Sequence, residues 1–167
     1  MHFPIKLTNL WSWWIERNGI LLPLPPVYNG FCDAGLNLLL DRFDADPASL
    51  TWYIGLISGT SFTTGLAATD TAASHPGWIE DANYSQATRP AWGPGAAVSK
   101  ARVNATRYTF TMNANRTIKG FFLISNDTKG GSTGTLLATG LFDADLVVAP
   151  AENLTGQTRM TLAGGSA

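Results

Sequence analysis

The chain has 167 residues, with 11 basic and 12 acidic side chains and a formal net charge of −1, so it lacks the positive excess typical of proteins that bind nucleic acid. Its single cysteine, Cys32, excludes an internal disulfide framework and a cysteine-based metal cage. Charged residues make up 14% of the chain, against about 25% in an average protein, which is typical of assembly subunits and of thin-surfaced β-sandwiches. No window supplies the ~20 apolar residues of a membrane span, and the start does not resemble a signal peptide, so we expect no membrane association.

Residues 1–31 are unusually rich in tryptophan and leucine, and the stretch LLPLPP near their end favours an extended path over a helix. One interpretation is that this segment packs on its own sandwich as an extra strand. The other, which we favour, is an extended apolar arm that lies on a neighbouring subunit, because tryptophan often anchors interfaces. We therefore divide the chain into an arm, residues 1–31, and a β-sandwich domain, residues 32–167. The predicted interface residues are Trp11, Trp13, Trp14, Ile15, Leu21, Leu22 and Leu24.

One helix and one buried strand come next in the chain. Residues 33–42, DAGLNLLLDR, place leucines at helical spacing after a possible capping Asp33, and we expect this leucine stripe to face the core. Residues 51–58, TWYIGLIS, are apolar on both faces and predict a strand covered on both sides, with Gly55 leaving room for a ring or backbone to pack closely. Residues 59–94 form a long loop that its own aromatic side chains should order.

The stretch VNATRYTFTMNANRTIKGFFLIS, residues 103–125, supplies the predicted centre of the fold. Apolar and polar side chains alternate up to Met112, which is typical of a half-buried strand. Asn113 and Asn115 then indicate a turn, and the unbroken apolar run at 121–124 indicates a strand covered on both faces. We expect these two strands to form a β-hairpin at the core.

The remaining strands complete a β-rich fold. Residues 135–142 and 146–149 predict short strands, and residues 154–162 predict an amphipathic closing strand in which Leu154, Thr158, Met160 and Leu162 share one face. The whole pattern predicts a mainly β fold, an antiparallel β-sandwich of immunoglobulin-like or jelly-roll type, with one short helix.

Catalytic and cofactor motifs are missing from the sequence. His75 has no nucleophile elbow, and the aspartates near residue 44 do not match a calcium loop. The glycines at 130–134 lack the Gly-Lys-Ser/Thr step of a phosphate-binding loop. We therefore expect no enzymatic activity, no cofactor and no metal. A carbohydrate-binding module remains an alternative, in which Trp78 and Trp92 would form the platform for a glycan.

Several segments, in the same order and spacing, resemble small structural proteins encoded by tailed bacteriophages and prophages. These segments are AGLNLLLDRF, TWYIGLIS, ATDTAASHPGWIE with YSQATRPAW, TIKGFFLIS, and TKGGSTGTLLATGLF, and they cover about residues 34–142. The resemblance rests on their joint occurrence, since none of them carries chemistry. The tryptophan- and proline-rich residues 1–31 lie outside it.

The resemblance implies a virion protein, assembled in the host cytoplasm and without catalytic residues. It would be a capsid decoration, or cement, protein that binds the major capsid protein and itself. The alternative within the same particle is a minor head–tail or tail protein. A sandwich that is poor in charge suits either role, because such subunits attach through buried apolar contacts and through strand edges that another chain can extend.

Overall fold

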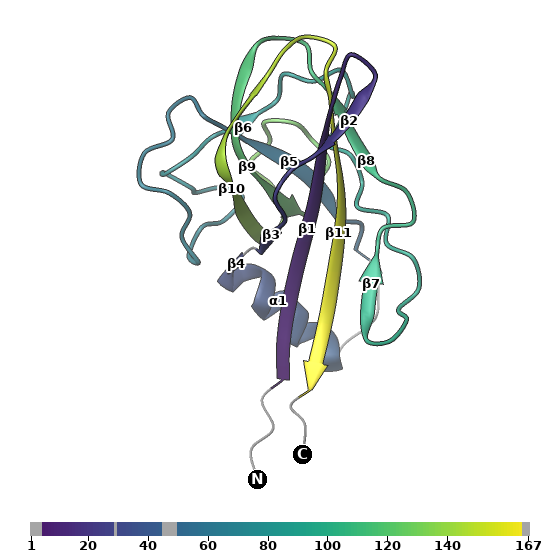
Figure 1. Cartoon of the computed structure of the whole chain (residues 1–167). Helices are drawn as coiled ribbons and strands as arrows, with labels where there is room; N and C mark the ends of the chain where they lie inside the picture. Colours follow the sequence, from purple (N-terminus) through teal and green to yellow (C-terminus); the bar gives the residue numbers. More distant parts are fainter. Residues whose placement is uncertain (1–4, 29, 45–49, 165–167) are drawn as a thin grey trace.

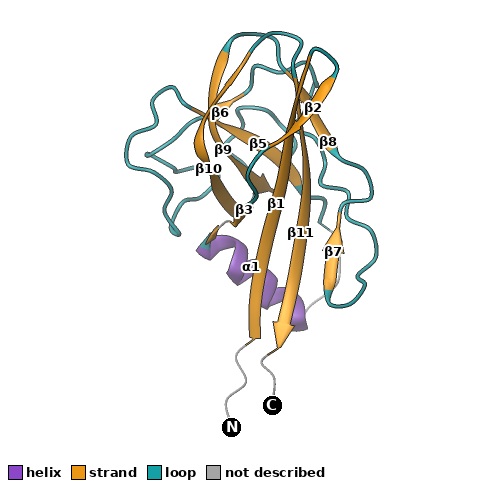
Figure 2. Cartoon of the chain, viewed as in Figure 1, coloured by secondary structure: helices purple, strands orange, loops and turns teal. Residues whose placement is uncertain are grey.

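The computed structural model describes residues 5–28, 30–44 and 50–164 (Figure 1). It is mainly β, with two antiparallel sheets in a sandwich-like arrangement and one short helix, so the predicted fold class is confirmed (Figure 2). In the first sheet the strand order is β2-β1-β11-β7, with β3 paired to β1 and β8 paired to β11. In the second sheet the order is β4-β10-β9-β5-β6. The strands of the first sheet are β1 (Ile5–Arg17), β2 (Ile20–Pro23), β3 (Val27–Tyr28), β7 (Ala101–Val103), β8 (Tyr108–Thr111) and β11 (Asn153–Gly164). Those of the second are β4 (Gly30–Phe31), β5 (Tyr53–Ser58), β6 (Glu80–Asp81), β9 (Arg116–Ile124) and β10 (Leu136–Val148).

Strand β1 lies inside the first sheet and is paired with β11 over twelve positions, from Ile5 opposite Gly164 to Glu16 opposite Asn153. Its other side pairs with β2 and β3. The expectation that residues 1–31 form an arm apart from the sandwich is therefore wrong for residues 5–28 and 30–31. The alternative, an added strand of the chain's own sandwich, describes them.

The physical reason is a period-two pattern within β1. Trp11, Trp13 and Ile15 alternate with Ser12 and Trp14, so every second side chain faces the opposite sheet. The alternation is hard to see in the sequence because Trp14, at an outward position that would usually be polar, is apolar like its inward-facing neighbours Trp13 and Ile15.

The main core lies between the two sheets and is dominated by aromatic rings. Trp11 and Trp13 stack with their ring centroids 6.3 Å apart, and both pack against Phe121 at 4.3 and 5.1 Å. The edge of Tyr108 meets Trp13 at 5.3 Å, which is a favourable arrangement for aromatic quadrupoles. The predicted closing strand is confirmed, since the inward-facing Leu154 and Thr158 of β11 are both 0% exposed.

The expected β-hairpin between residues 103–112 and 117–125 is wrong. Strand β8 pairs with β11 in the first sheet, whereas β9 pairs with β10 and β5 in the second. The turn at residues 113–115 therefore carries the chain from one sheet to the other. Both flanking segments are buried as predicted, but a turn signal does not specify whether the strands it joins pair with each other.

A second core covers the outer face of the second sheet. The long loop between β5 and β6 folds over this face, and Trp78 from the loop packs on Phe122 of β9 at 5.2 Å. This layer explains why β5 and β9 are apolar on both faces. Gly55 lies directly opposite Phe122, and a Cβ atom at Gly55 would come 2.1 Å from the Cζ atom of that ring.

The helix α1 (Asp33–Asp44) occurs where it was predicted and packs on β10. Gly35 permits the close approach, since a Cβ there would lie 2.5 Å from the Cα atom of Leu137. The predicted leucine stripe is only partly in the core. Leu39 packs against it, but Leu36 and Leu40 are 37% and 65% exposed.

Candidate interaction surface

The residues predicted to contact a neighbouring subunit divide into two groups. Trp11, Trp13 and Ile15 are 0%, 0% and 2% exposed, so the chain's own core covers them and the prediction of an interface role is wrong for these three. Their inward position on β1 is the cause. The other four are more accessible: Trp14, Leu21, Leu22 and Leu24.

Each of these four has a distinct environment. Trp14 lies on the outer face of the first sheet, where the guanidinium carbon of Arg107 sits 3.7 Å from its ring centroid. Leu24 is half-buried and packs against the main core. Leu21 and Leu22 are 43% and 42% exposed, and Ile20, which we did not predict, is 61% exposed. The exposed part of the predicted interface is therefore strand β2.

Strand β2 is held in place by a tight hairpin with β1. Asn18 and Gly19 form its two-residue turn with φ values of 51° and 75°, as a type I′ turn requires at both central positions. Arg17 lies opposite Ile20, and its side chain donates to the carbonyl oxygen of Val147 and forms an ion pair with Glu152 at 2.9 Å. The end of the hairpin is thus tied to strand β10.

The outer edge of β2 has no strand partner among residues 5–28, 30–44 and 50–164. In a two-residue hairpin the closing pair is hydrogen-bonded, so the backbone groups of Ile20 and Leu22 face β1. The bond from the backbone N–H of Leu24 to the carbonyl of Trp13, at 2.8 Å, continues the same alternation. The backbone groups of Leu21 and Pro23 must then point outward, and proline has no N–H to donate.

A partner strand would consequently find the N–H and C=O of Leu21 and the C=O of Pro23, but no second N–H donor. Proline on an edge strand is a common device against uncontrolled strand addition. Side-chain contact with Ile20, Leu21 and Leu22, which we call the β2 edge, must therefore supply most of any binding here. Val147 of β10, whose backbone oxygen accepts from Arg17, is itself 63% exposed.

The two tryptophans of the predicted glycan platform are both buried, so that prediction is wrong for each. Trp78 is 2% exposed, because His75 stacks on it at 3.9 Å and Phe122 packs against it. Trp92 is 3% exposed and donates from Nε1 to the backbone oxygen of Thr158. Neither ring presents a face on which a sugar could stack.

The one thiol of the chain, Cys32, is buried. Burial raises the pKa of the Cys32 thiol to about 11, so the reactive thiolate is scarce at neutral pH. Within the same described residues, no group of three or more His, Cys, Asp or Glu side chains is placed to hold a metal ion. None of the helices in that part is long and apolar enough to cross a membrane.

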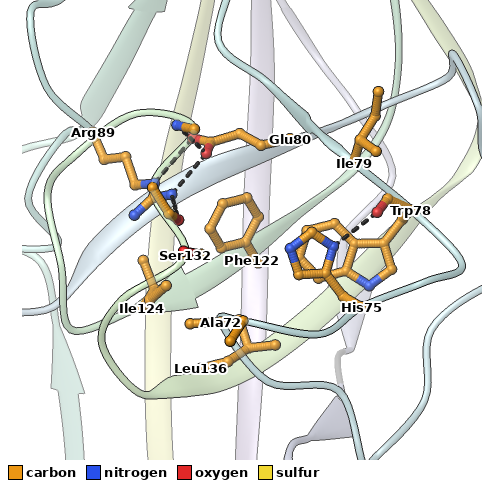
Figure 3. A pocket seen from close by; sticks show the side chains of 13 residues that line it. Ala72, His75, Trp78, Ile79, Glu80, Arg89, Phe122, Ile124, Ser132 and Leu136 are labelled. Carbon is orange, nitrogen blue, oxygen red and sulfur yellow. Dashed lines mark hydrogen bonds and ion pairs between the residues drawn. The ribbon is translucent and has the colours of Figure 1, made fainter.

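A hollow of about 290 Å³ lies on the outer side of the second sheet. Figure 3 shows the side chains that line it. Arg89 and Glu80 form one wall, joined by two hydrogen bonds of 3.0 and 2.7 Å, and both side chains are almost fully buried. His75 and Trp78 lie on the opposite side, and Phe122 lies between the two groups. We did not predict this hollow, since its residues are far apart in the sequence.

No family model matches the chain, and no curated protein matches it.

Proposed function

We propose that this protein is a non-enzymatic structural component of a tailed-bacteriophage virion, a capsid decoration protein that attaches to the major capsid protein and to further copies of itself. The observation that carries the proposal is the β2 edge, in which three consecutive large aliphatic side chains are 61%, 43% and 42% exposed on a fixed hairpin. In β2, Leu22 lies opposite Ile15 and Leu21 lies opposite Glu16, so Ile20 and Leu22 share one face of the strand and Leu21 lies on the other. A partner that encloses the edge would contact both faces, and exposed large apolar side chains of this kind are typical of contact surfaces. The sequence resemblance to phage structural proteins supplies the kind of particle.

The size of the β2 edge indicates how such a subunit would attach. Full burial of an aliphatic side chain contributes about 1.5–3 kcal/mol, so three that are about half exposed offer roughly 3 kcal/mol before any ordering cost. That is too little for a stable contact between two molecules in solution. A decoration protein, however, meets a repeated lattice, where several weak contacts act together and raise the overall affinity greatly. We therefore propose that the subunit contacts the capsid protein and other copies of itself at the same time.

The test uses a phage that lacks the gene, with the protein supplied from a plasmid. In the Ile20→Lys/Leu21→Lys double variant the charges would disrupt the β2 edge, and we expect incorporation into purified particles to fall at least about tenfold relative to wild type. Val98→Lys is the matched control, because Val98 is 71% exposed and precedes β7 on the opposite edge of the first sheet. Both variants should fold normally. Equal incorporation of the double variant and the control would contradict the proposal.

A minor head–tail or tail protein is the second candidate, and the same edge supports it. The two differ in copy number, since head–tail components follow the symmetry of the particle axis whereas decoration proteins follow the whole shell.

A further inference from the structure

The basic residues of this chain are concentrated in one part of the fold, although the net charge is only −1. Residues 82–126 contain six basic side chains and no acidic one. The six strands of the first sheet contain four basic residues and a single acidic residue, Glu16, which accepts a hydrogen bond from Nδ2 of Asn153 at 3.0 Å. The first sheet is therefore positively charged, and the compensating acidic residues lie elsewhere in the chain.

Two of these cations point outward from the middle strands of the first sheet. The inward positions of β1 and β11 are those of Trp11 and Thr158, which are both 0% exposed. Because side chains alternate along a strand, Lys6 of β1 and Arg159 of β11 lie on the outer face, and both are exposed. That face has no covering layer of the kind that the long loop forms over the second sheet.

Three further cations lie on or beside this face. The guanidinium carbon of Arg107 sits over the outward-facing ring of Trp14, 3.7 Å from its centroid. Lys100 and Arg102 are exposed at β7, the edge strand beside β11, and Arg102 donates to the carbonyl oxygen of Gly95. None of the five cations forms an ion pair within the part of the chain that the structure describes. Their positive charges are therefore uncompensated there, and we call this surface the basic face.

The basic face also carries an exposed aromatic ring. Tyr28 of β3 lies opposite Leu10 of β1, and Leu10 lies opposite Arg159 of β11, so these three side chains point the same way in one row across the sheet. Tyr28 is 76% exposed, so its ring is open to a ligand. Its Cα atom is two strand spacings, roughly 10 Å, from that of Arg159. One extended ligand can therefore contact the ring and the guanidinium together.

We propose that the basic face binds single-stranded nucleic acid, with a base stacked on Tyr28 and the phosphates at Arg159, Lys6 and the cations beside β7. Proteins bind single strands through this combination of a positively charged surface and an aromatic platform. The net charge of −1 averages over faces of opposite sign, whereas a bound strand responds to charges within about 10 Å. The inference is independent of the proposed function, since it does not use the β2 edge.

The test measures fluorescence anisotropy of a labelled oligothymidine of about 12 nucleotides, titrated with the full chain. If three or four phosphates are neutralised, the affinity should fall about 20- to 50-fold between 50 and 200 mM salt, because the logarithmic slope is about −0.7 per phosphate. Lys6→Gln/Arg159→Gln should weaken binding at least about tenfold at 50 mM salt and reduce the slope by about 1.4. Lys119→Gln/Lys129→Gln changes the net charge equally but alters β9 and the turn after it, so it should bind like the wild type.

Tyr28→Ala separates stacking from charge. It should lower the affinity at least about fivefold and leave the salt slope unchanged, whereas Tyr28→Phe should retain binding. Heparin, titrated in parallel, offers negative charge without bases. Heparin binding that equals or exceeds oligothymidine binding, with no effect of Tyr28→Ala on either, would overturn the inference and indicate an acidic polysaccharide. Absence of saturable oligothymidine binding at 50 mM salt would also overturn it, as would equal affinity of the two double variants.

Discussion

Trp13→Ala is the sharpest test of the position of β1, because the side chain is 0% exposed and has aromatic neighbours on several sides. Its ring centroid lies 5.1 Å from Phe121, 5.3 Å from Tyr108 and 5.4 Å from Phe142. Truncating a buried tryptophan or phenylalanine to alanine costs about 3–5 kcal/mol, and this crowded site allows little collapse around the cavity. We expect a loss of about 4 kcal/mol in the free energy of unfolding, a large part of the total for a domain of this size.

Two further variants test whether the large loss of stability is specific to side chains on the inward face of β1. Trp13→Phe should cost less, about 1–2 kcal/mol, because it keeps a ring and removes an Nε1–H that has no partner among the described residues. Trp14→Ala, on the outer face, should cost about 1 kcal/mol, mainly through its contact with Arg107. Urea unfolding followed by far-ultraviolet circular dichroism gives all three values. Equal losses for Trp13→Ala and Trp14→Ala would refute the placement of β1 in the core.

The other predictions concern the second core and the buried thiol. Arg89→Ala should lower the free energy of unfolding by about 3–5 kcal/mol, measured by urea unfolding, because it leaves the Glu80 carboxylate buried without its partner. A double-mutant cycle with Glu80→Ala should show that the two losses are coupled. Additive losses would contradict this role of the ion pair. Gly55→Ala should lower stability by about 1–3 kcal/mol through a clash with the ring opposite, whereas Gly30→Ala, with no atom within 4 Å of the added Cβ, should change it by less than about 0.5 kcal/mol. Burial raises the pKa of Cys32 from 9.0 to about 11, so the unfolded chain loses this proton first and stability should fall as pH rises from 9 to 11. Between pH 9 and 11 the urea midpoint should fall less steeply with pH for Cys32→Ala than for the wild type. The same pH dependence in both proteins would refute the assignment to Cys32.

The sequence predicted the parts of the fold that depend on local patterns. The helix that begins at Asp33, the buried strand predicted at residues 51–58 and found at Tyr53–Ser58, and the alternation of β11 all follow from periodicity and were confirmed. Pairing between strands could not be read in the same way. The turn at 113–115 looked like a hairpin turn, but the partners of β8 and β9 are strands from elsewhere in the chain, and only tertiary packing selects them.

The candidate surface was predicted in part, for a similar reason. Leu21 and Leu22 are exposed, but Trp11 and Trp13 of β1 are buried, because composition alone does not distinguish a segment that is apolar throughout from one that alternates. Counting every second residue from Trp11 would have given Trp13 and Ile15 an inward position. The hollow beside Trp78 had no sequence signal, since loops distant in the chain form it.

Quantitative mass spectrometry of purified particles of the phage that we propose encodes this chain is the most direct test of the proposed function. We predict that the protein is present in each particle at a number of copies on the order of hundreds, as a shell-wide decoration requires. A count of about six to twelve would place it instead at the head–tail axis. Absence of the protein from particles that are complete and infectious would contradict the claim that it is a structural component of the virion.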